Sequence, residues 1–296
     1  MYVESRKKSI KRFYHLLIKR HIFGITSPLR VLPDFFVIGP GRTGTTSLFH
    51  YLNEHPCLVK SAYDELGFFD VNFHLGLQWY RSLFPTIFTK RKTKSKTNHF
   101  QTYDVSPSYV RRPWVARRMH ELFPKSKYIV VLRNPVDKTY SHYYLSGFKF
   151  DKNNKQINKQ RTELRSFEDI INDDMKNIEK FHNEPKNDHY FGSYVEKSFL
   201  ARGFYIEQLP IWFKLFSKDQ ILVISSEDLS LKTRSTLKII FKFLNLPDSD
   251  LKNIEKVNVS NYKPMNKNTR RLLVDYFKPY NEKLYKFLNQ KFDWDK

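Results

Sequence analysis

Cysteine is almost missing from this chain of 296 residues, which contains only Cys57. A single cysteine excludes an internal disulfide and any metal cluster built from several cysteines, so we expect Cys57 to be a small core residue. The scarcity of cysteine favours a reducing, cytoplasmic location. A protein without disulfides also folds in a secretory compartment, which leaves the Golgi lumen as the alternative.

Long apolar runs are missing as well. The first thirty residues are basic and interrupted by charges, which argues against a transmembrane anchor or a clear signal peptide in this stretch. Residues 5–23, SRKKSIKRFYHLLIKRHIF, fit a terminal helix packed on the domain, or a basic amphipathic helix in peripheral contact with an anionic membrane. We expect residues 1–33 to form a basic N-terminal extension and residues 34–296 to form one domain.

Acidic residues are scarce relative to basic ones, with 30 against 52, and the formal net charge is +22. This charge favours a polyanionic partner, and nucleic acid, an anionic membrane, a nucleotide or an acidic glycan would each satisfy it. The 26 phenylalanines and 18 tyrosines would suit base stacking in a nucleic-acid-binding protein. They fall mostly at core spacing, however, and the sequence has no recognised nucleic-acid motif, so we expect no nucleic-acid partner.

Short apolar runs alternate with helical patterns along the chain, without an internal repeat. The runs at 35–38, 100–105, 128–132 and 221–224 predict buried strands. Helices are predicted over 113–123, 136–147, 194–216, 233–245 and 268–290, and Pro210 should break the one over 194–216. The pattern predicts a single α/β domain with a central, mainly parallel sheet flanked by helices, and with ligands at the carboxyl ends of its strands.

A polar stretch from about 149 to 190 interrupts this alternation. It includes KFDKNNKQINKQR at 149–161, which is polar enough to be a mobile loop. We expect a surface insertion here, with a flap beside a substrate cleft as the alternative.

The segment FFVIGPGRTGTTSLFHYL at 35–52 predicts a buried strand, a tight loop and a helix. Such a loop directs backbone N–H groups and the positive end of the helix dipole at one point, which suits an anion. Hydroxyl groups of Thr45, Thr46 and Ser47 add donors, and Arg42 adds a positive charge. Thr45 stands where the GxxxxGK[ST] pattern of nucleoside triphosphatases has lysine, so a kinase-like phosphoryl-transfer enzyme is the alternative.

A second candidate anion site follows the predicted strand at 128–132. Arg133 emerges where that strand ends, Pro135 begins a helix, and Ser141 lies inside it. A guanidinium and a hydroxyl together can bind a phosphate monoester. The sequence therefore predicts two anion sites at neighbouring strand ends.

The order of four motifs resembles sulfotransferases that use 3′-phosphoadenosine 5′-phosphosulfate (PAPS), most closely the heparan sulfate and carbohydrate group. GPGRTGTTSL at 39–48 is similar to their 5′-phosphosulfate loop, and YIVVLRNPVDKTYSHYY at 128–144 to their 3′-phosphate-binding strand and helix. ELGFFD at 65–70 and YDVSPSY at 103–109 resemble their substrate-cleft segments. The resemblance spans most of residues 35–294 and implies a sulfotransferase fold with a phosphate-loop-like strand, loop and helix.

The resemblance also implies an activity and a donor site. A sulfuryl group would pass from PAPS to an acceptor hydroxyl or amine, leaving 3′-phosphoadenosine 5′-phosphate, and no metal would be required. The implied donor-binding residues are Gly41, Arg42, Thr43, Gly44, Thr45, Thr46, Ser47, Arg133 and Ser141, together with Lys263 and Lys267, which are otherwise solvated lysines.

By the same resemblance, Arg42 stabilises the leaving phosphate and Glu65 is the base that takes the acceptor's proton. Asp64, or a histidine at 74 or 99, is the competing base. We expect Phe68 and Phe69 to shield Glu65 from water. Two positions depart from the group, which often has lysine at position 42 and usually has it at position 105, where this chain has valine.

We also expect a cleft lined by aromatic side chains that binds the acceptor. Aromatic rings bind the apolar face of a sugar, and the resemblance points to a carbohydrate or glycolipid acceptor, with peptidyl tyrosine and small phenols as alternatives. The residues expected to line this cleft are Tyr63, Phe68, Phe69, Trp79, Ser106 and Tyr109.

Overall fold

The computed structural model describes residues 25–146, 166–182, 198–251, 254 and 262–294. At its centre is a five-stranded sheet in the order β2-β3-β1-β4-β5, in which every neighbouring pair is parallel. The strands are β1 (Phe35–Gly39), β2 (Leu58–Lys60), β3 (Gln101–Val105), β4 (Lys127–Leu132) and β5 (Ile221–Ser225). The predicted α/β class and its four predicted strands are confirmed, and β2 is an additional short edge strand.

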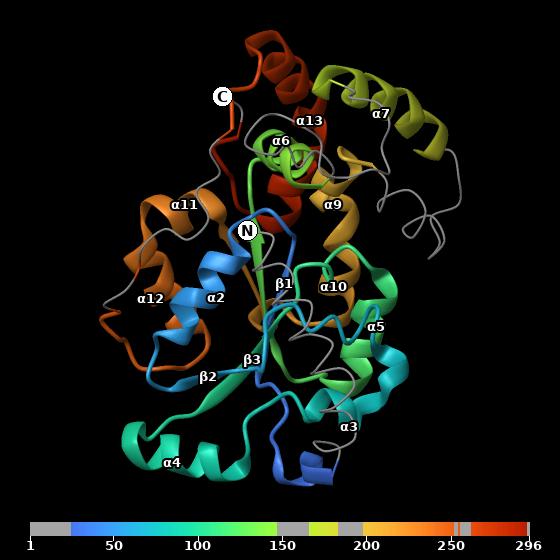
Figure 1. The fold of residues 1–296 in the computed structure, drawn as a ribbon. Coiled ribbons are helices and arrows are strands. Elements are labelled where there is room, and N and C mark those ends of the chain that lie inside the picture. The colour runs from blue at the N-terminus through green and yellow to red at the C-terminus, as the bar shows by residue number, and fades with distance from the viewer. Residues whose placement is uncertain (1–24, 147–165, 183–197, 252–253, 255–261, 295–296) are drawn as a thin grey trace, which may run out of the picture.

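Successive residues of the central strands point to opposite faces of the sheet, and this alternation builds two hydrophobic cores. Phe36 and Ile38 of β1 enter one core, whereas Phe35 and Val37 enter the other. The first core is covered by α3 (Gly76–Arg81), α5 (Pro113–Leu122) and α10 (Pro210–Leu215), and the second by α2 (Thr45–Asn53), α11 (Ser226–Leu231) and α12 (Thr233–Phe243). Figure 1 shows the sheet between these two layers.

A third cluster of buried side chains joins α6 (Pro135–Ser146), α7 (Phe167–His182) and α13 (Lys267–Leu288). The helix α7 lies within the polar stretch 149–190, where we expected a surface insertion and predicted no helix. Residues 149–161, the part expected to be a mobile loop, lie outside the described residues. Phe167, Ile171 and Ile178 recur at helical spacing and are buried, so this amphipathic helix packs its apolar stripe on the domain.

Most of the other predicted helices are confirmed within two residues of their expected ends. The described part of 194–216 is instead a set of short pieces, a 3₁₀ turn at Ala201–Gly203, α9 (Tyr205–Gln208) and α10, and Pro210 separates the last two. The helix α4 (Ile87–Thr97) was not predicted, because none of its residues is buried and it has no apolar periodicity. No helix in the described part of the chain is long and apolar enough to cross a membrane.

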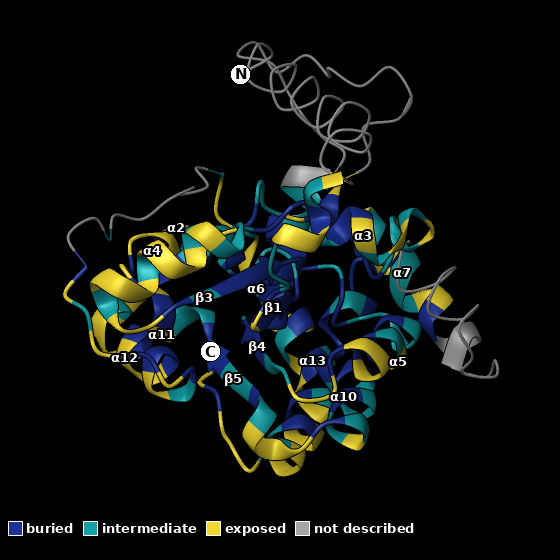
Figure 2. Ribbon diagram, turned by 90° about the horizontal axis from the view of Figure 1, so that it is seen from below, coloured by how far each residue is buried: buried dark blue, intermediate teal, exposed yellow. Residues whose placement is uncertain are grey.

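The burial pattern follows this layered arrangement. In Figure 2 the central strands are buried, while the helices around them carry exposed residues on their outer faces. Cys57 is buried and free, as expected for a small core residue. The carboxyl ends of β1, β3 and β4 meet at one edge of this packed scaffold, where the loops that carry the predicted motifs begin.

At position 39, the last residue of β1, only glycine fits the backbone conformation and the space available. Its φ is +106°, and an added Cβ would lie 2.1 Å from the backbone oxygen of Pro107. We expect Gly39→Ala to lower the free energy of unfolding by about 3 kcal/mol or more, because it adds both backbone strain and a clash with main-chain atoms. Chemical denaturation measures this change.

Gly41→Ala is the matched control in the same loop. A Cβ on Gly41 would meet only the side chain of Pro107, at 3.9 Å, so the loss of stability should stay below about 1 kcal/mol. Equal losses for the two variants would contradict this account of Gly39.

Candidate functional site

The loop between β1 and α2 has the conformation that an anion site needs. Gly44 precedes α2 with a φ of 89°, and Arg42 also adopts a left-handed φ of 70°. The buried hydroxyl of Thr43 donates to the carbonyl of Pro40 at 2.6 Å, which holds the loop closed. Thr43 therefore shapes the loop with its side chain, while the loop's backbone and the start of α2 face the strand ends.

Three hydroxyl residues begin α2, and they differ in exposure. Thr45 is buried, whereas Thr46 and Ser47 are half-buried. Ser47 forms a hydrogen bond with the Tyr51 hydroxyl one turn later, so part of its bonding capacity is used within the helix. The backbone N–H groups of this first turn have no partner inside the helix, which is the general property that lets a helix start bind an anion.

Arg42, Ser141 and Arg133, predicted from two separate motifs, lie together in the structure. The Arg42 side chain donates to the Ser141 hydroxyl from Nε at 3.2 Å and from Nη2 at 3.0 Å. Arg133 donates from Nη1 to the backbone oxygen of Arg42 at 3.1 Å. The two expected anion sites therefore form one continuous cationic site, in which α6 orients the arginine of the β1–α2 loop.

The gathered positive charges of this region lower the pKa values of its basic groups. Burial lowers the pKa of the Arg42 guanidinium, and the nearby charge of Arg133 lowers it further, while Glu65 opposes the shift. Next to Ser141, the pKa of His142 falls to about 2, because the ring is buried and faces cations that include Arg202 and Lys138. A bound anion would relieve this repulsion.

Glu65 interacts electrostatically with Arg42 and is held at the end of β3. It is exposed and has a left-handed φ of 56°, and its backbone N–H donates to the carbonyl of Val105 at 2.9 Å. Glu65 lines a cavity of about 300 Å³ that also contacts Gly41, Ser106 and Arg111. The cavity thus connects a carboxylate to the loop of Arg42, and Phe68 and Phe69 do not shield that carboxylate from water.

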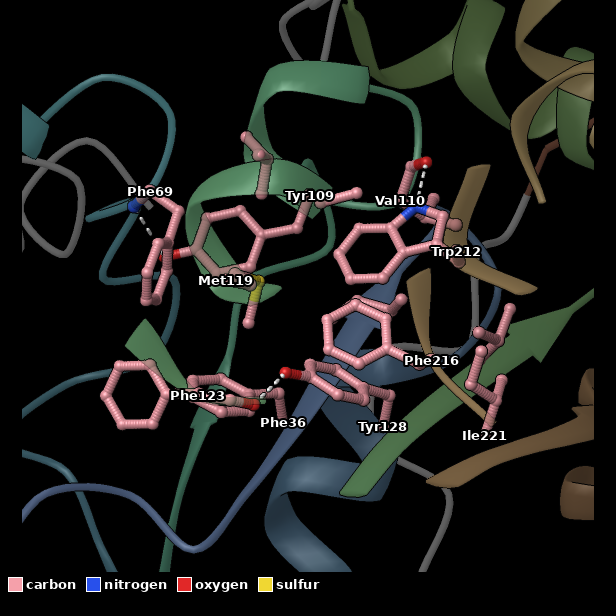
Figure 3. Packing of buried hydrophobic residues seen from close by; sticks show 14 of the residues in the cluster. Phe36, Phe69, Tyr109, Val110, Met119, Phe123, Tyr128, Trp212, Phe216 and Ile221 are labelled. Atoms are coloured by element: carbon pink, nitrogen blue, oxygen red, sulfur yellow. Dashed lines mark hydrogen bonds between the residues drawn. The ribbon is translucent and has the colours of Figure 1, made fainter. Parts of the chain in front are cut away.

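The structure corrects the expectation of an aromatic cleft. Phe68, Phe69, Trp79 and Tyr109 are each at most 3% exposed and belong to the first hydrophobic core. Figure 3 shows Phe69 and Tyr109 among the packed rings of that core. These four rings are core residues here, because their large apolar surfaces are buried against one another, and none of the described residues that line the cavity is aromatic.

The other residues singled out in the sequence differ in burial and in their distance from the cavity. Tyr63 is half-buried and packs against the first core, and Ser106 lines the cavity. Lys263 and Lys267 are exposed, and the backbone oxygen of Lys263 accepts a hydrogen bond from Tyr140 of α6 at 2.9 Å. Val105 is buried in the second core, so its side chain takes no part in the cavity.

Among the alternative bases, Asp64 is half-buried next to Glu65, and His74 is exposed but does not line the cavity. His99 precedes the first residue of β3 and therefore lies at the amino end of the sheet, away from the loops that form the site. It is excluded as a base for chemistry at the opposite end.

Two buried or half-buried titratable residues next to the site were not predicted from the sequence. One of them is His142, and its position directly after Ser141 is the only feature of the sequence that could have drawn attention to it. Asp104 is buried in β3 and accepts hydrogen bonds from Ser106, Tyr80 and Tyr109. A carboxylate inside an apolar strand is an unusual feature that sequence reasoning could have noticed.

Comparison with known proteins gives a consistent result. A family model described as the sulfotransferase domain matches residues 32–288. Among curated proteins, the membrane-associated sulfotransferase kil1 of Dictyostelium discoideum is 27% identical, over 91% of this chain and 68% of that protein. The mouse bifunctional heparan sulfate N-deacetylase/N-sulfotransferase 4 is 26% identical, over 88% of this chain but only 30% of its own length.

The fold has a counterpart among solved structures. A sulfotransferase from Alicyclobacillus acidocaldarius superposes with a TM-score of 0.63 at 21% sequence identity, covering 90% of this chain and 100% of that one. This similarity concerns the fold and shows that the parallel sheet and its helices form an arrangement that sulfotransferases adopt.

Proposed function

The chain belongs to the sulfotransferase domain family, and from this premise we propose that it transfers a sulfuryl group from PAPS to a hydroxyl or amine of a carbohydrate or glycolipid acceptor. One observation carries the proposal. The guanidinium of Arg42, in the loop between β1 and α2, is fixed by Ser141, and it lies within electrostatic range of Arg133 and of the carboxylate of Glu65. The positive charge that an anionic donor needs and a carboxylate that could accept a proton therefore occur close to one another.

The role proposed for Arg42 is electrostatic. When the bond between sulfur and the bridging phosphate oxygen breaks, negative charge grows on that oxygen, and a positive group already held in place stabilises the transition state more than the ground state. Burial and the Ser141 hydroxyl restrict the guanidinium, so little reorganisation is required. Arginine does not give up its proton near neutral pH, so it acts here without serving as a general acid.

Glu65 is proposed to take the proton of the acceptor. As the new bond from sulfur to the acceptor oxygen or nitrogen forms, that atom loses its proton to the carboxylate, and the phosphate oxygen leaves with the electron pair of the broken bond. Arg42 and Glu65 interact electrostatically, so the proposed base lies within range of the group proposed to stabilise the leaving oxygen. The cavity beside Glu65 gives an acceptor access to this point.

The lining of the cavity supports a polar acceptor. Ser106, Asp70 and Arg111 contribute hydrogen-bonding and charged groups to it. A polyhydroxylated molecule such as a sugar would satisfy these groups, whereas a phenol would satisfy few of them. The mouse relative named above is a heparan sulfate enzyme, which agrees with a carbohydrate acceptor.

A peripheral membrane contact through residues 5–23, which lie outside the described residues, completes the proposal. The Dictyostelium relative is described as membrane-associated, and this supports such a contact. We propose a cytoplasmic location, with the Golgi lumen as the alternative. Imaging of the full chain with and without residues 5–23 distinguishes these locations and tests the contact.

Thermal unfolding tests the donor assignment. We expect 3′-phosphoadenosine 5′-phosphate to raise the melting temperature without added metal, because Arg42 and Arg133 supply the positive charge that Mg²⁺ supplies in nucleotide kinases, and Ser141 adds a hydroxyl. At a concentration of about 100 times its dissociation constant, the bisphosphate would stabilise the fold by about 2.7 kcal/mol. ATP, which lacks the 3′-phosphate, should produce a much smaller shift.

The control is the same experiment with Mg²⁺ and ATP together. Equal shifts for ATP and the bisphosphate, or a shift that appears only with Mg²⁺, would contradict the donor assignment and favour a phosphoryl-transfer enzyme instead.

A further inference from the structure

Asp104 is a buried carboxylate at the carboxyl end of β3 that accepts three hydrogen bonds. Ser106 donates to its Oδ1 at 2.7 Å, while Tyr80 and Tyr109 donate to its Oδ2 at 2.8 and 3.1 Å. All four side chains are at most 1% exposed. A buried carboxylate with this many donors is specifically held, and the role proposed for the site so far does not use it.

Two of the three donors also bind the segment that carries Glu65. The Ser106 hydroxyl accepts from the backbone N–H of Gly67 at 3.2 Å, and the Tyr109 hydroxyl accepts from the backbone N–H of Phe69 at 3.3 Å. Figure 3 shows the second of these bonds at the edge of the core. Together with the bond from Glu65 to the Val105 carbonyl, they attach residues 65–69 to the end of β3 at alternate positions.

We infer that Asp104 is the positioning residue for the base: its ionised carboxylate fixes the direction of the Ser106 and Tyr109 hydroxyls, and these hold the backbone of residues 65–69 so that Glu65 faces Arg42. The inference rests on the proposed function, since it assigns Asp104 a role through Glu65. Asp104 itself lies in the core and does not reach the acceptor.

The direction of each hydrogen bond is the physical basis. A hydroxyl has one proton to donate, so a hydroxyl that donates to a carboxylate keeps its lone pairs for the N–H groups of Gly67 and Phe69. A protonated Asp104 would itself donate from one oxygen, and the hydroxyl facing that oxygen would have to turn its own proton elsewhere. The displaced proton competes for the lone pairs that hold the N–H groups of Gly67 and Phe69, for example where the Tyr109 hydroxyl turns to the Ser106 hydroxyl, so protonation loosens one of the attachments of the segment.

The charge state of Asp104 is adjustable near neutral pH. Burial raises the pKa of Asp104 to about 6, and the hydrogen bonds from Ser106, Tyr80 and Tyr109 hold it below what burial alone would give. The other charged group that faces it is Asp70, which raises its pKa and is itself paired with Arg112. Tyr80 and Tyr109 stay protonated, because burial raises the pKa of both hydroxyls well above their ordinary value.

The sign of this shift separates activity from stability. The folded pKa of Asp104 lies above its ordinary value of 3.8, so the folded state holds the proton more tightly, and the contribution of Asp104 to stability falls as pH rises from about 4 to about 6. Acidification to pH 5 therefore strengthens the fold through this group while it protonates the carboxylate. A loss of turnover near pH 6 without unfolding is the expected signature.

A matched pair of tyrosine variants tests the inference. Tyr80→Phe and Tyr109→Phe each remove one hydrogen bond to Oδ2 of Asp104, but only Tyr109 holds the segment of Glu65. At pH 8 we expect Tyr109→Phe to lose at least about tenfold in turnover with unchanged affinity for 3′-phosphoadenosine 5′-phosphate, and Tyr80→Phe to retain its turnover. Equal turnover in the two variants would overturn the inference.

The pH profile gives a readout that a merely structural role would not move. Because Tyr80 lowers the pKa of Asp104, Tyr80→Phe should shift the acid limb of turnover to higher pH, whereas Asp104→Asn should abolish that limb and lower the plateau. An acid limb that stays in place in Tyr80→Phe belongs to another group and contradicts the assignment. If wild-type protein transfers no sulfuryl group from radiolabelled PAPS, the proposed function fails; if it transfers normally and the variants do likewise, only the role of Asp104 fails.

Discussion

Glu65→Gln is expected to lower the turnover of sulfuryl transfer by roughly 100-fold or more while the affinity for 3′-phosphoadenosine 5′-phosphate stays nearly unchanged. Glutamine keeps the size and hydrogen-bonding reach of glutamate but does not accept the acceptor's proton. Glu65 is exposed, so the substitution should alter the free energy of unfolding by no more than about 0.5 kcal/mol. Radiolabelled PAPS with neutral oligosaccharides or chemically desulfated heparan sulfate as acceptors provides the assay.

Asp64→Asn is the control for this measurement. It removes the same charge one residue away, yet Asp64 does not line the cavity, so its turnover should remain within a few-fold of the wild type. Near-normal turnover of Glu65→Gln together with a large loss in Asp64→Asn would transfer the role of the base to Asp64. A large loss in both would show that the net charge beside Arg42, and no single proton acceptor, determines the rate.

The sequence alone predicted the strand, loop and helix around Arg42, where we propose that the donor binds, because the features of this segment are local. A buried strand, a glycine-rich turn and a run of hydroxyl residues at a helix start occupy fewer than twenty consecutive positions, and each part has one plausible backbone conformation. The same holds for Arg133 and Ser141 at the next strand end. What the sequence did not reveal is that Ser141 bonds Arg42, since that contact joins residues 99 positions apart.

The aromatic cleft expected for the acceptor was predicted less well, for a different physical reason. The segments next to the site contain four aromatic residues, Phe68, Phe69, Trp79 and Tyr109. An aromatic side chain at such a position can pack in the hydrophobic core or contact a ligand, and its residue type does not distinguish the two. Burial depends on how distant segments pack, and the pattern of aromatic residues alone does not determine it. The Asp104 network escaped for the same reason, because Tyr80 comes from a helix that the sequence analysis did not identify.

The polar stretch at 149–190 shows a related limit. Its polarity suggested a surface insertion without a predicted helix, yet three apolar residues at helical spacing pack α7 against α6 and α13. A hydrophobic stripe on an otherwise polar helix contributes little to overall composition but a great deal to packing. The periodicity of the apolar positions was therefore the better guide than composition.

Replacing the two arginines of the site should separate stabilisation of the transition state from donor binding. Arg42→Met removes the positive charge proposed to face the leaving oxygen, and we expect turnover to fall by about 10²- to 10³-fold, the usual scale for losing one fixed stabilising donor. Arg133→Met should instead weaken the binding of 3′-phosphoadenosine 5′-phosphate by about 2–4 kcal/mol. Calorimetric titration and turnover at saturating PAPS measure the two effects separately.

Arg133 donates a hydrogen bond to the backbone oxygen of Arg42, so it supports the loop of Arg42 as well as the proposed binding of the donor. We therefore expect some loss of turnover in Arg133→Met, but less than in Arg42→Met. Arg234→Met is the matched control, because it removes the same charge from an exposed arginine on α12 that pairs with Asp250. An equal loss of turnover in all three variants would mean that overall positive charge determines the rate, and not the placement of Arg42 by Ser141. If Arg42→Met weakens donor binding but keeps its turnover, that arginine binds the donor's phosphates away from the breaking bond.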